Sequence, residues 1–239
     1  MNFERYFFKM STRSAQNQNL KKIIGIATFS ALAFVCTLFI RIPIQFLTFD
    51  VKDAIICIAS FIYGPLSAII IALISSFLES VTIGGSTGPI GFLMNFISSS
   101  AFSFVAAYIY CKNRRLDFAI IGIYCAVIVL TGVMLVLNIF LTPIYLGVPT
   151  EAVLEFLPTL LLPFNLAKAL LNGAIAMLLY KPIVVALRRA KLLECRAAGN
   201  NKLSEVTFSP DHFSKMTVVT IIVGALTIAV GVVIFFIIA

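Results

Sequence analysis

The chain has 239 residues, of which 61% are hydrophobic and 12% are charged, and its mean hydropathy is +1.06. Soluble globular domains carry about 25% charged residues, so this composition excludes a soluble globular domain. Apolar runs of about 20 residues recur along the chain, and such a run crosses roughly 30 Å of hydrocarbon as a helix. A membrane barrel would instead show shorter, alternating segments. The composition therefore predicts an all-α integral membrane protein.

Seven apolar runs are the expected membrane helices. Proline ends the first run at Arg41-Ile42-Pro43, because it cannot continue a helix. Gly64-Pro65 joins the second run to the third, and this turn pair favours a tight hairpin of two short helices over one kinked helix. The runs cover 23–40, 54–63, 66–78, 90–110, 118–140, 159–187 and 216–239.

The order of these runs predicts four parts. We expect an N-terminal cytoplasmic segment, a six-helix substrate-binding membrane domain, a cytoplasmic polar linker and one extra transmembrane helix, over residues 1–22, 23–192, 193–215 and 216–239. Gly224 and Gly231 form a possible packing edge on the extra helix. A flexible linker of about 25 residues would nevertheless allow this helix to lie apart from the other six.

The basic residues predict the topology. Fifteen of the 18 Lys and Arg residues lie before the first run, in the loop at 111–115, or between Lys181 and Lys215. The positive-inside rule places such segments in the cytoplasm. We therefore expect a cytoplasmic N-terminus, six crossings that return to the cytoplasm, and a C-terminus outside. The loops at 41–53, 79–89 and 141–158 would then face outward.

Signals for enzyme chemistry or a metal are weak. The five cysteines lie far apart, mostly in apolar runs, and we interpret them as small buried apolar residues. His212 is the only histidine, and the chain contains no HExxH or GxSxG motif. No lysine follows the glycines of the loop at 84–91, so it is not a nucleotide-binding P-loop. We expect no metal, no cofactor, no ATP site and no enzymatic activity in this chain.

Lys168 is the residue that a simple membrane bundle does not explain. A cation within an apolar helix costs roughly 2.5–3.5 kcal/mol and usually marks a functional site. Asn165 and Asn172 lie three and four residues away, on the same helical face. Asn138 in the fifth run can meet this polar stripe or bond between helices. The stripe predicts an outward-facing pocket for a small, flat, neutral or weakly anionic molecule; the alternative is a lysine that extends to the outer interface.

Two outer loops can close over such a pocket. The segment 45–53 mixes aromatic, hydroxyl and acidic groups, and we expect Asp53 to cap the helix that it opens. The glycines of 84–91 can bring backbone groups close to a ligand. Glu79 beside that loop could bind ligand, but as a carboxylate at a helix end we expect it to be solvated.

Four motifs occur in order along residues 20–192: Phe49-Asp50-Val51-Lys52-Asp53; Phe61-Ile62-Tyr63-Gly64-Pro65-Leu66; Gly85-Ser86-Thr87-Gly88-Pro89-Ile90-Gly91 before Met94-Asn95-Phe96; and Pro163-Phe164-Asn165-Leu166-Ala167-Lys168. Together with six spans of the appropriate topology, they resemble the riboflavin-specific substrate-binding (S) components of energy-coupling factor (ECF) transporters. The resemblance implies a subunit of a bacterial cell membrane that binds riboflavin from outside. It also implies association with a transmembrane coupling subunit and two cytoplasmic ATPase subunits, which would hydrolyse the ATP.

The resemblance further implies which residues act. The flavin contacts map onto two helices and the first outer loop: Asn138, Asn165, Lys168, Leu47, Thr48 and Phe49. An asparagine amide can match the alternating donors and acceptors of the flavin pyrimidine edge, and a lysine can donate to its carbonyls. Phe46, Phe49 or Tyr145 can cover the apolar rings. Ala27 and Ala31 match the small residues through which the family contacts its coupling subunit.

Two other functions are compatible with the sequence. One is an S component for another vitamin or precursor. The other is a membrane assembly protein without a transported ligand, in which Asn165 and Lys168 are packing residues. The run at 216–239 is a departure from the family pattern, because six-helix members lack it.

Overall fold

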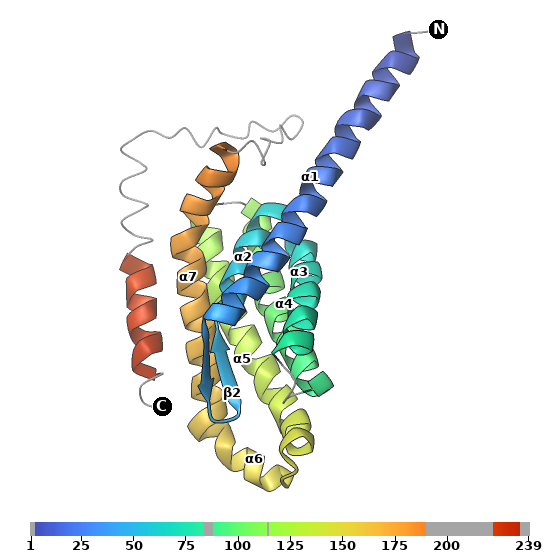
Figure 1. The fold of residues 1–239 in the computed structure, drawn as a ribbon. Helices are drawn as coiled ribbons and strands as arrows, with labels where there is room; N and C mark the ends of the chain where they lie inside the picture. The colour runs from blue at the N-terminus through green and yellow to red at the C-terminus, as the bar shows by residue number, and fades with distance from the viewer. Residues whose placement is uncertain (1–2, 84–87, 114, 190–221, 235–239) are drawn as a thin grey trace.

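The computed structural model describes residues 3–83, 88–113, 115–189 and 222–234. These residues form a helical bundle with a small β-hairpin at one end, and we call this end the hairpin end (Figure 1). The elements are α1 (Phe3–Phe39), β1 (Arg41–Ile44), β2 (Leu47–Asp50), α2 (Lys52–Tyr63), α3 (Pro65–Thr82), α4 (Gly88–Asn113), α5 (Leu116–Leu146), α6 (Thr150–Phe156), the π-helical segment η1 (Leu157–Leu161) and α7 (Leu162–Arg189), followed by the C-terminal helix, Ile222–Ile234.

Five helices in the described part of the chain are long and apolar enough to cross a membrane. They are Asn19–Phe39, Pro65–Thr82, Gly88–Asn113, Asp117–Leu146 and Thr150–Ala186, and the C-terminal helix is a shorter apolar one. The prediction of an all-α membrane protein is confirmed. The second expected run, now α2, is too short to cross the membrane, because its 12 residues span only about 18 Å at 1.5 Å per residue.

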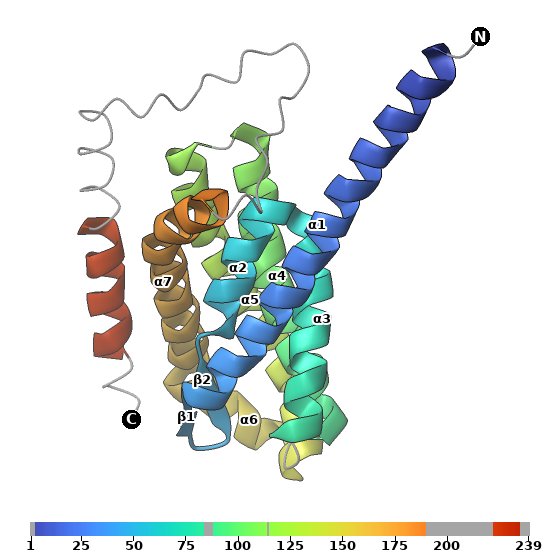
Figure 2. The same cartoon turned by 45° about the horizontal axis from the view of Figure 1, so that its top comes forward.

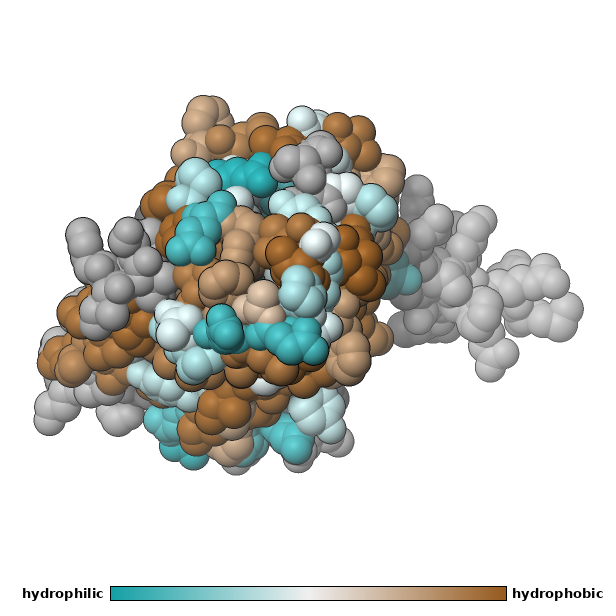
Figure 3. Space-filling view, turned by 90° about the horizontal axis from the view of Figure 1, so that it is seen from below, coloured by the Kyte–Doolittle hydropathy of each residue, from teal (hydrophilic) through white to brown (hydrophobic). Residues whose placement is uncertain are grey.

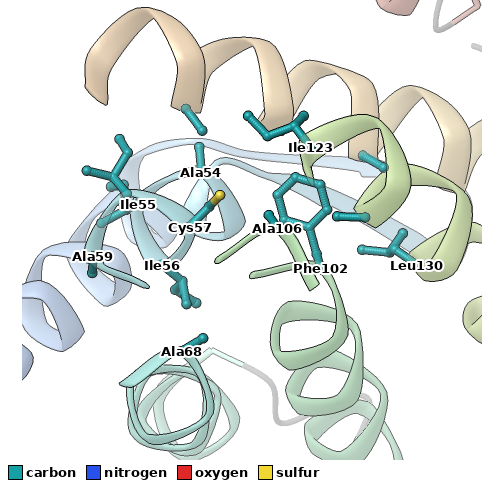
Figure 4. Packing of buried hydrophobic residues seen from close by; sticks show 14 of the residues in the cluster. Ala54, Ile55, Ile56, Cys57, Ala59, Ala68, Phe102, Ala106, Ile123 and Leu130 are labelled. Atoms are coloured by element: carbon teal, nitrogen blue, oxygen red, sulfur yellow. The ribbon is translucent and has the colours of Figure 1, made fainter. Parts of the chain in front are cut away.

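Helix α2 lies at the centre of the bundle. Every residue from Lys52 to Phe61 is buried, and the helix packs against α1, α3, α4 and α7. Figure 4 shows side chains of α2 near Ala68 of α3 and Phe102 of α4. A short helix that is buried on all sides is a core element. Cys57 is fully buried, as predicted, whereas Cys36, Cys111 and Cys125 are only partly buried.

The connection from α2 to α3 is the predicted hairpin. Gly64 has φ 100° and ψ 167°, a conformation open to glycine and strained for other residues. Pro65 occupies the first turn of α3, where no intrahelical hydrogen bond to its nitrogen is needed. This tight turn brings the start of α2 level with the end of α3.

The segment after α1 forms an antiparallel hairpin where the sequence predicted only a loop. The register pairs Arg41 with Asp50 and Ile44 with Leu47. Gln45, in the two-residue turn, has φ 51°. The pairing satisfies backbone N–H and C=O groups of both strands. It also delivers Asp50 to the start of α2.

The C-terminal helix lies beside α7 in both ribbon views (Figures 1 and 2). A Cβ atom at Gly231 would lie 2.8 Å from Leu171, and one at Gly224 would lie 3.1 Å from Leu178. The predicted glycine edge is therefore a packing edge, although the sequence also allowed a helix that stays apart. The expected linker at 193–215 lies outside the described residues.

Candidate ligand-binding site

Lys168 is buried beneath the β-hairpin. Its side chain, on α7, is 7% exposed, and its ammonium nitrogen lies 2.8 Å from Oδ2 of Asp50, the last residue of β2. The same ammonium is 3.5 Å from the Thr48 carbonyl oxygen. Burial alone would raise the pKa of Asp50, but Lys168 and Lys52 lower it below its ordinary value. The alternative of a lysine that extends to the interface is therefore wrong.

Asn172 joins this ion pair to the start of α2. Its Nδ2 donates to the carbonyls of Asp50 at 2.9 Å and Lys168 at 3.0 Å, and its Oδ1 accepts the Ala54 N–H at 3.0 Å. The first N–H groups of a helix have no partner within the helix, so Asn172 caps α2 from another element. The Asp50 carboxylate accepts the Lys52 N–H at 3.2 Å and completes the cap.

Asp53 does not cap α2, so that prediction is wrong. The N-cap is Val51, which makes no side-chain bond, and the Asp53 carboxylate instead accepts the hydroxyl of Ser99 on α4. The physical reason is position. Asp53 lies one residue inside the helix, and the Lys52 and Ala54 N–H groups already bond to Asp50 and Asn172.

Lys52 and Glu79 form a second buried ion pair. Their side chains are 1% and 4% exposed, and Asn95 of α4 donates to the other Glu79 oxygen at 3.3 Å. The expectation of a solvated Glu79 is wrong, because the α2–α3 hairpin places the end of α3 against the start of α2. The pair ties α2, α3 and α4 together.

Five buried ionisable side chains thus converge near the hairpin end: Asp50, Lys52, Asp53, Glu79 and Lys168. We call them the charge cluster. Removing charges from water is costly unless they are paired, and ionisable groups within a membrane protein usually mark a functional site. Figure 3 shows that the surface of this end carries separate hydrophilic patches among hydrophobic residues. No group of three His, Cys, Asp or Glu side chains in the described residues could hold a metal ion.

The two asparagines of the sequence prediction are buried but bond within their own helices. Asn165 is 3% exposed and its Nδ2 donates to the Leu161 carbonyl at 2.8 Å. Asn138 is fully buried, donates to the Met134 carbonyl and accepts the Thr142 hydroxyl at 2.8 Å. In the described part of the chain, the polar stripe on α7 is therefore split: Lys168 and Asn172 join the charge cluster, whereas Asn165 does not bond to it.

The three loop residues of the prediction lie in β2. Phe49 is buried, and Leu47 and Thr48 are half-buried. Thr48 faces Lys168 through its carbonyl rather than through its hydroxyl. In the turn of the hairpin, the Phe46 ring lies 6.4 Å from the Phe156 ring at the end of α6, centroid to centroid. The turn of the hairpin thus meets the end of α6.

The predicted coupling residues lie on the outer face of α1. Ala27 and Ala31 are exposed, whereas Phe29 and Ala33 are buried against the bundle. Gly25 allows the closest approach on the inner face, because a Cβ atom there would overlap the Tyr63 hydroxyl. The two alanines are therefore accessible to another helix.

The sequence-based prediction missed Asp50, Lys52, Asp53 and Glu79 as members of one cluster. A usable signal was present, because Lys52 and Lys168 are two of the three basic residues outside the cytoplasmic segments. A cation expected within or beside the membrane requires a carboxylate partner, and the nearby acids were the candidates.

A profile of the family described as "ECF transporter, substrate-specific component" matches residues 21–184. The riboflavin transporter RibU of Staphylococcus aureus (strain TCH60) is 33% identical over 187 residues, which cover 74% of this chain and 97% of that protein. The riboflavin transporter FmnP of Bacillus subtilis (strain 168) is 26% identical over 188 residues, covering 72% and 98% respectively.

The fold is also similar to a solved structure described as the S component of a bacterial ECF transporter. The TM-score is 0.61 at 33% sequence identity, and the match covers 72% of this chain and 99% of that one. The family match ends at residue 184, before the C-terminal helix begins.

Proposed function

The chain belongs to the family of ECF transporter substrate-specific components, which are transporter subunits rather than enzymes, and from this premise we propose that it captures riboflavin for import. The observation that carries this proposal is the buried Lys168 at the hairpin end, held by Asp50 and covered by β2. Two of its relatives named above are riboflavin transporters.

The chemistry of α7 suits a flavin. An ammonium group has three N–H donors, and in the described contacts Lys168 directs two of them to Asp50 and the Thr48 carbonyl. One donor is left for a flavin carbonyl. Asn165 and Asn138 offer amide groups whose present bonds are local, and these amides can turn toward the donors and acceptors of the pyrimidine edge.

The surrounding rings suit the flat part of the ligand. Phe46 and Phe49 belong to the hairpin, and Tyr145 lies half-buried near the end of α5. Leu47 adds apolar surface from β2. In this proposal the ligand enters at the hairpin end, and these side chains cover its flat ring system.

The hairpin end faces outward in this proposal. The positive-inside rule assigns the segments with Lys21, Lys22 and Lys112 to the cytoplasm. Lys21 and Lys22 lie at the start of the first membrane-spanning helix and the hairpin follows its end, so the hairpin lies on the opposite side. The chain would act in a bacterial cell membrane with a transmembrane coupling subunit, which contacts Ala27 and Ala31, and with two cytoplasmic ATPases. The C-terminus would lie outside.

Titration of the detergent-purified full chain with riboflavin tests the proposal. We expect saturable quenching of flavin fluorescence, and no competition from thiamine, folate or biotin. If riboflavin fails to bind and one of the other vitamins does, the chain is an S component for that vitamin. If none binds to a folded, monodisperse preparation, the function as a riboflavin-capturing subunit is contradicted.

A further inference from the structure

We propose that the C-terminal helix is a built-in brace for α7 that slows the escape of bound ligand. This inference rests on the proposed function, because the braced part of α7 carries Lys168 and Asn172. The family match ends before this helix, so the brace is a feature of this chain beyond the matched region.

The contact between the two helices is close. A Cβ atom at Gly231 would lie 2.8 Å from Cγ of Leu171, closer than side-chain atoms pack. A Cβ atom at Gly224 would lie 3.1 Å from Leu178. The glycines are seven residues apart and meet two leucines seven residues apart in the opposite order, so the helices run antiparallel in contact over two turns. Such small-residue contacts allow helices in a membrane to pack closely.

A hydrogen bond fixes the C-terminal helix to α5 as well. The Thr227 hydroxyl donates to the Val223 carbonyl within its own helix at 2.7 Å, and lies 2.9 Å from the Tyr124 hydroxyl. Because the Thr227 proton is already used, Tyr124 is the donor of the second bond. Thr227 is 6% exposed. The C-terminal helix therefore contacts both α5 and α7.

The structure of α7 explains why support at this place matters. The helix follows the π-helical segment η1 and contains Pro182. Proline has no N–H, so the carbonyl of Leu178, four residues earlier, loses its intrahelical donor. Gly224 packs on Leu178 itself. The segment with Lys168 and Asn172 thus lies between two irregular points, and the C-terminal helix contacts it at Leu171 and at the second of these points.

Neighbouring residues of α7 connect the brace to the charge cluster. Leu171 faces Gly231 of the C-terminal helix, the next residue Asn172 caps α2, and Gly173 packs closely on Ile123 of α5. Three successive residues therefore fix α7 against three different elements. Moving Leu171 must move Asn172, and with it the cap that holds Asp50 beside Lys168.

The test compares dissociation of radiolabelled riboflavin from full-length variants after a chase with unlabelled riboflavin. Gly231→Leu places bulk against Leu171, and we expect roughly tenfold faster release. Gly132→Leu is the matched control, because Gly132 is exposed on α5 and nothing lies within 4 Å of its Cβ position. Adding Leu171→Ala to Gly231→Leu makes room for the new side chain and should restore slow release.

Tyr124→Phe provides a second variant that removes the bond to Thr227 without adding volume, and it should also speed release. Wild-type release rates in both Gly231→Leu and Tyr124→Phe would overturn the brace while leaving riboflavin binding intact. If the wild type itself does not bind riboflavin, the proposed function fails, and the brace is judged by thermal unfolding of the same variants. Equal midpoints for Gly231→Leu and Gly132→Leu would then overturn it.

Discussion

Asp50 joins three elements through a single residue. Its carboxylate accepts hydrogen bonds from the Lys168 ammonium of α7 and the Lys52 N–H of α2. Its carbonyl accepts one from the Asn172 amide. Since Asp50 ends β2, it connects the hairpin to the bundle. A change at this position should therefore alter both folding and binding.

The first prediction is that Asp50→Asn destabilises the protein by about 3–5 kcal/mol, because the buried Lys168 ammonium then loses the carboxylate that pairs with it. Asp117→Asn is the control. Asp117 pairs with Arg115 at 3.5 Å and its side chain is 58% exposed, so its loss should cost at most about 1 kcal/mol. Thermal unfolding in detergent measures both, and equal stabilities would show that the pair with Lys168 contributes nothing.

The second prediction concerns the other buried pair. Lys52→Met leaves Glu79 buried without its partner and should strongly lower the unfolding midpoint. Adding Glu79→Gln removes that charge, so the double variant should be more stable than the single one. A double variant that is less stable than Lys52→Met would contradict the pairing.

At the residue scale, the sequence identified Lys168 because a cation in an apolar run stands out. Its partner could not be assigned, since Asp50 is 118 residues away and reaches it only through the β-hairpin. Glu79 was expected in solvent because its partner, Lys52, likewise reaches it only through the tertiary fold. The energetic cost of a buried charge is readable from sequence, but the identity of its partner depends on tertiary structure.

At the scale of elements, α2 differs from its neighbours. It is short, buried on every side and capped by Asn172 from α7 rather than by its own N-cap residue. Its position depends on the turn at Gly64, which reverses the chain into α3. The apolar runs and this turn were predictable from hydropathy and the Gly-Pro pair.

The third prediction is that Gly64→Ala destabilises the fold by about 1–3 kcal/mol, because φ 100° is strained for a residue with a Cβ atom. In Gly132→Ala the same substitution falls in a regular helix with open space around it, where alanine is favoured. Comparison of the two unfolding midpoints checks this. A Gly64→Ala variant as stable as Gly132→Ala would show that the turn tolerates another conformation.

Other elements were not predictable from the pattern. The hairpin strands contain four residues each and a proline, which gives little strand signal. The packing of the C-terminal helix depends on Leu171 and Leu178, which resemble any other leucines of a membrane helix. Only the glycine spacing on that helix indicated a contact.

At the scale of the whole molecule, the proposed ligand site and the face proposed for coupling lie on different parts of the bundle. The charge cluster lies under the hairpin, whereas Ala27 and Ala31 are exposed on the outer face of α1. The C-terminal helix covers part of α7 and α5. The α1 face is thus accessible to a partner helix without displacing the brace.

The fourth prediction is that Ala27→Leu together with Ala31→Leu leaves riboflavin affinity unchanged but reduces uptake by cells, because bulk on α1 prevents close helix approach. Ala225→Leu is the control, since Ala225 is exposed on the C-terminal helix. Uptake should remain normal in this control. Normal uptake in the α1 double variant would place the coupling contact elsewhere.

The most direct test of the binding site is the riboflavin affinity of the double variant Lys168→Met/Asp50→Asn, measured by fluorescence titration. Removing both charges leaves neither Lys168 nor Asp50 as an unpaired buried charge, so the double variant should be less destabilised than a single variant. Lys112→Met, at an exposed position on α4, is the control. We predict that the double variant loses about 1–3 kcal/mol of binding free energy, roughly 5- to 150-fold in affinity, while Lys112→Met binds like the wild type. A folded double variant with wild-type affinity would contradict the assignment of Lys168 to the riboflavin site.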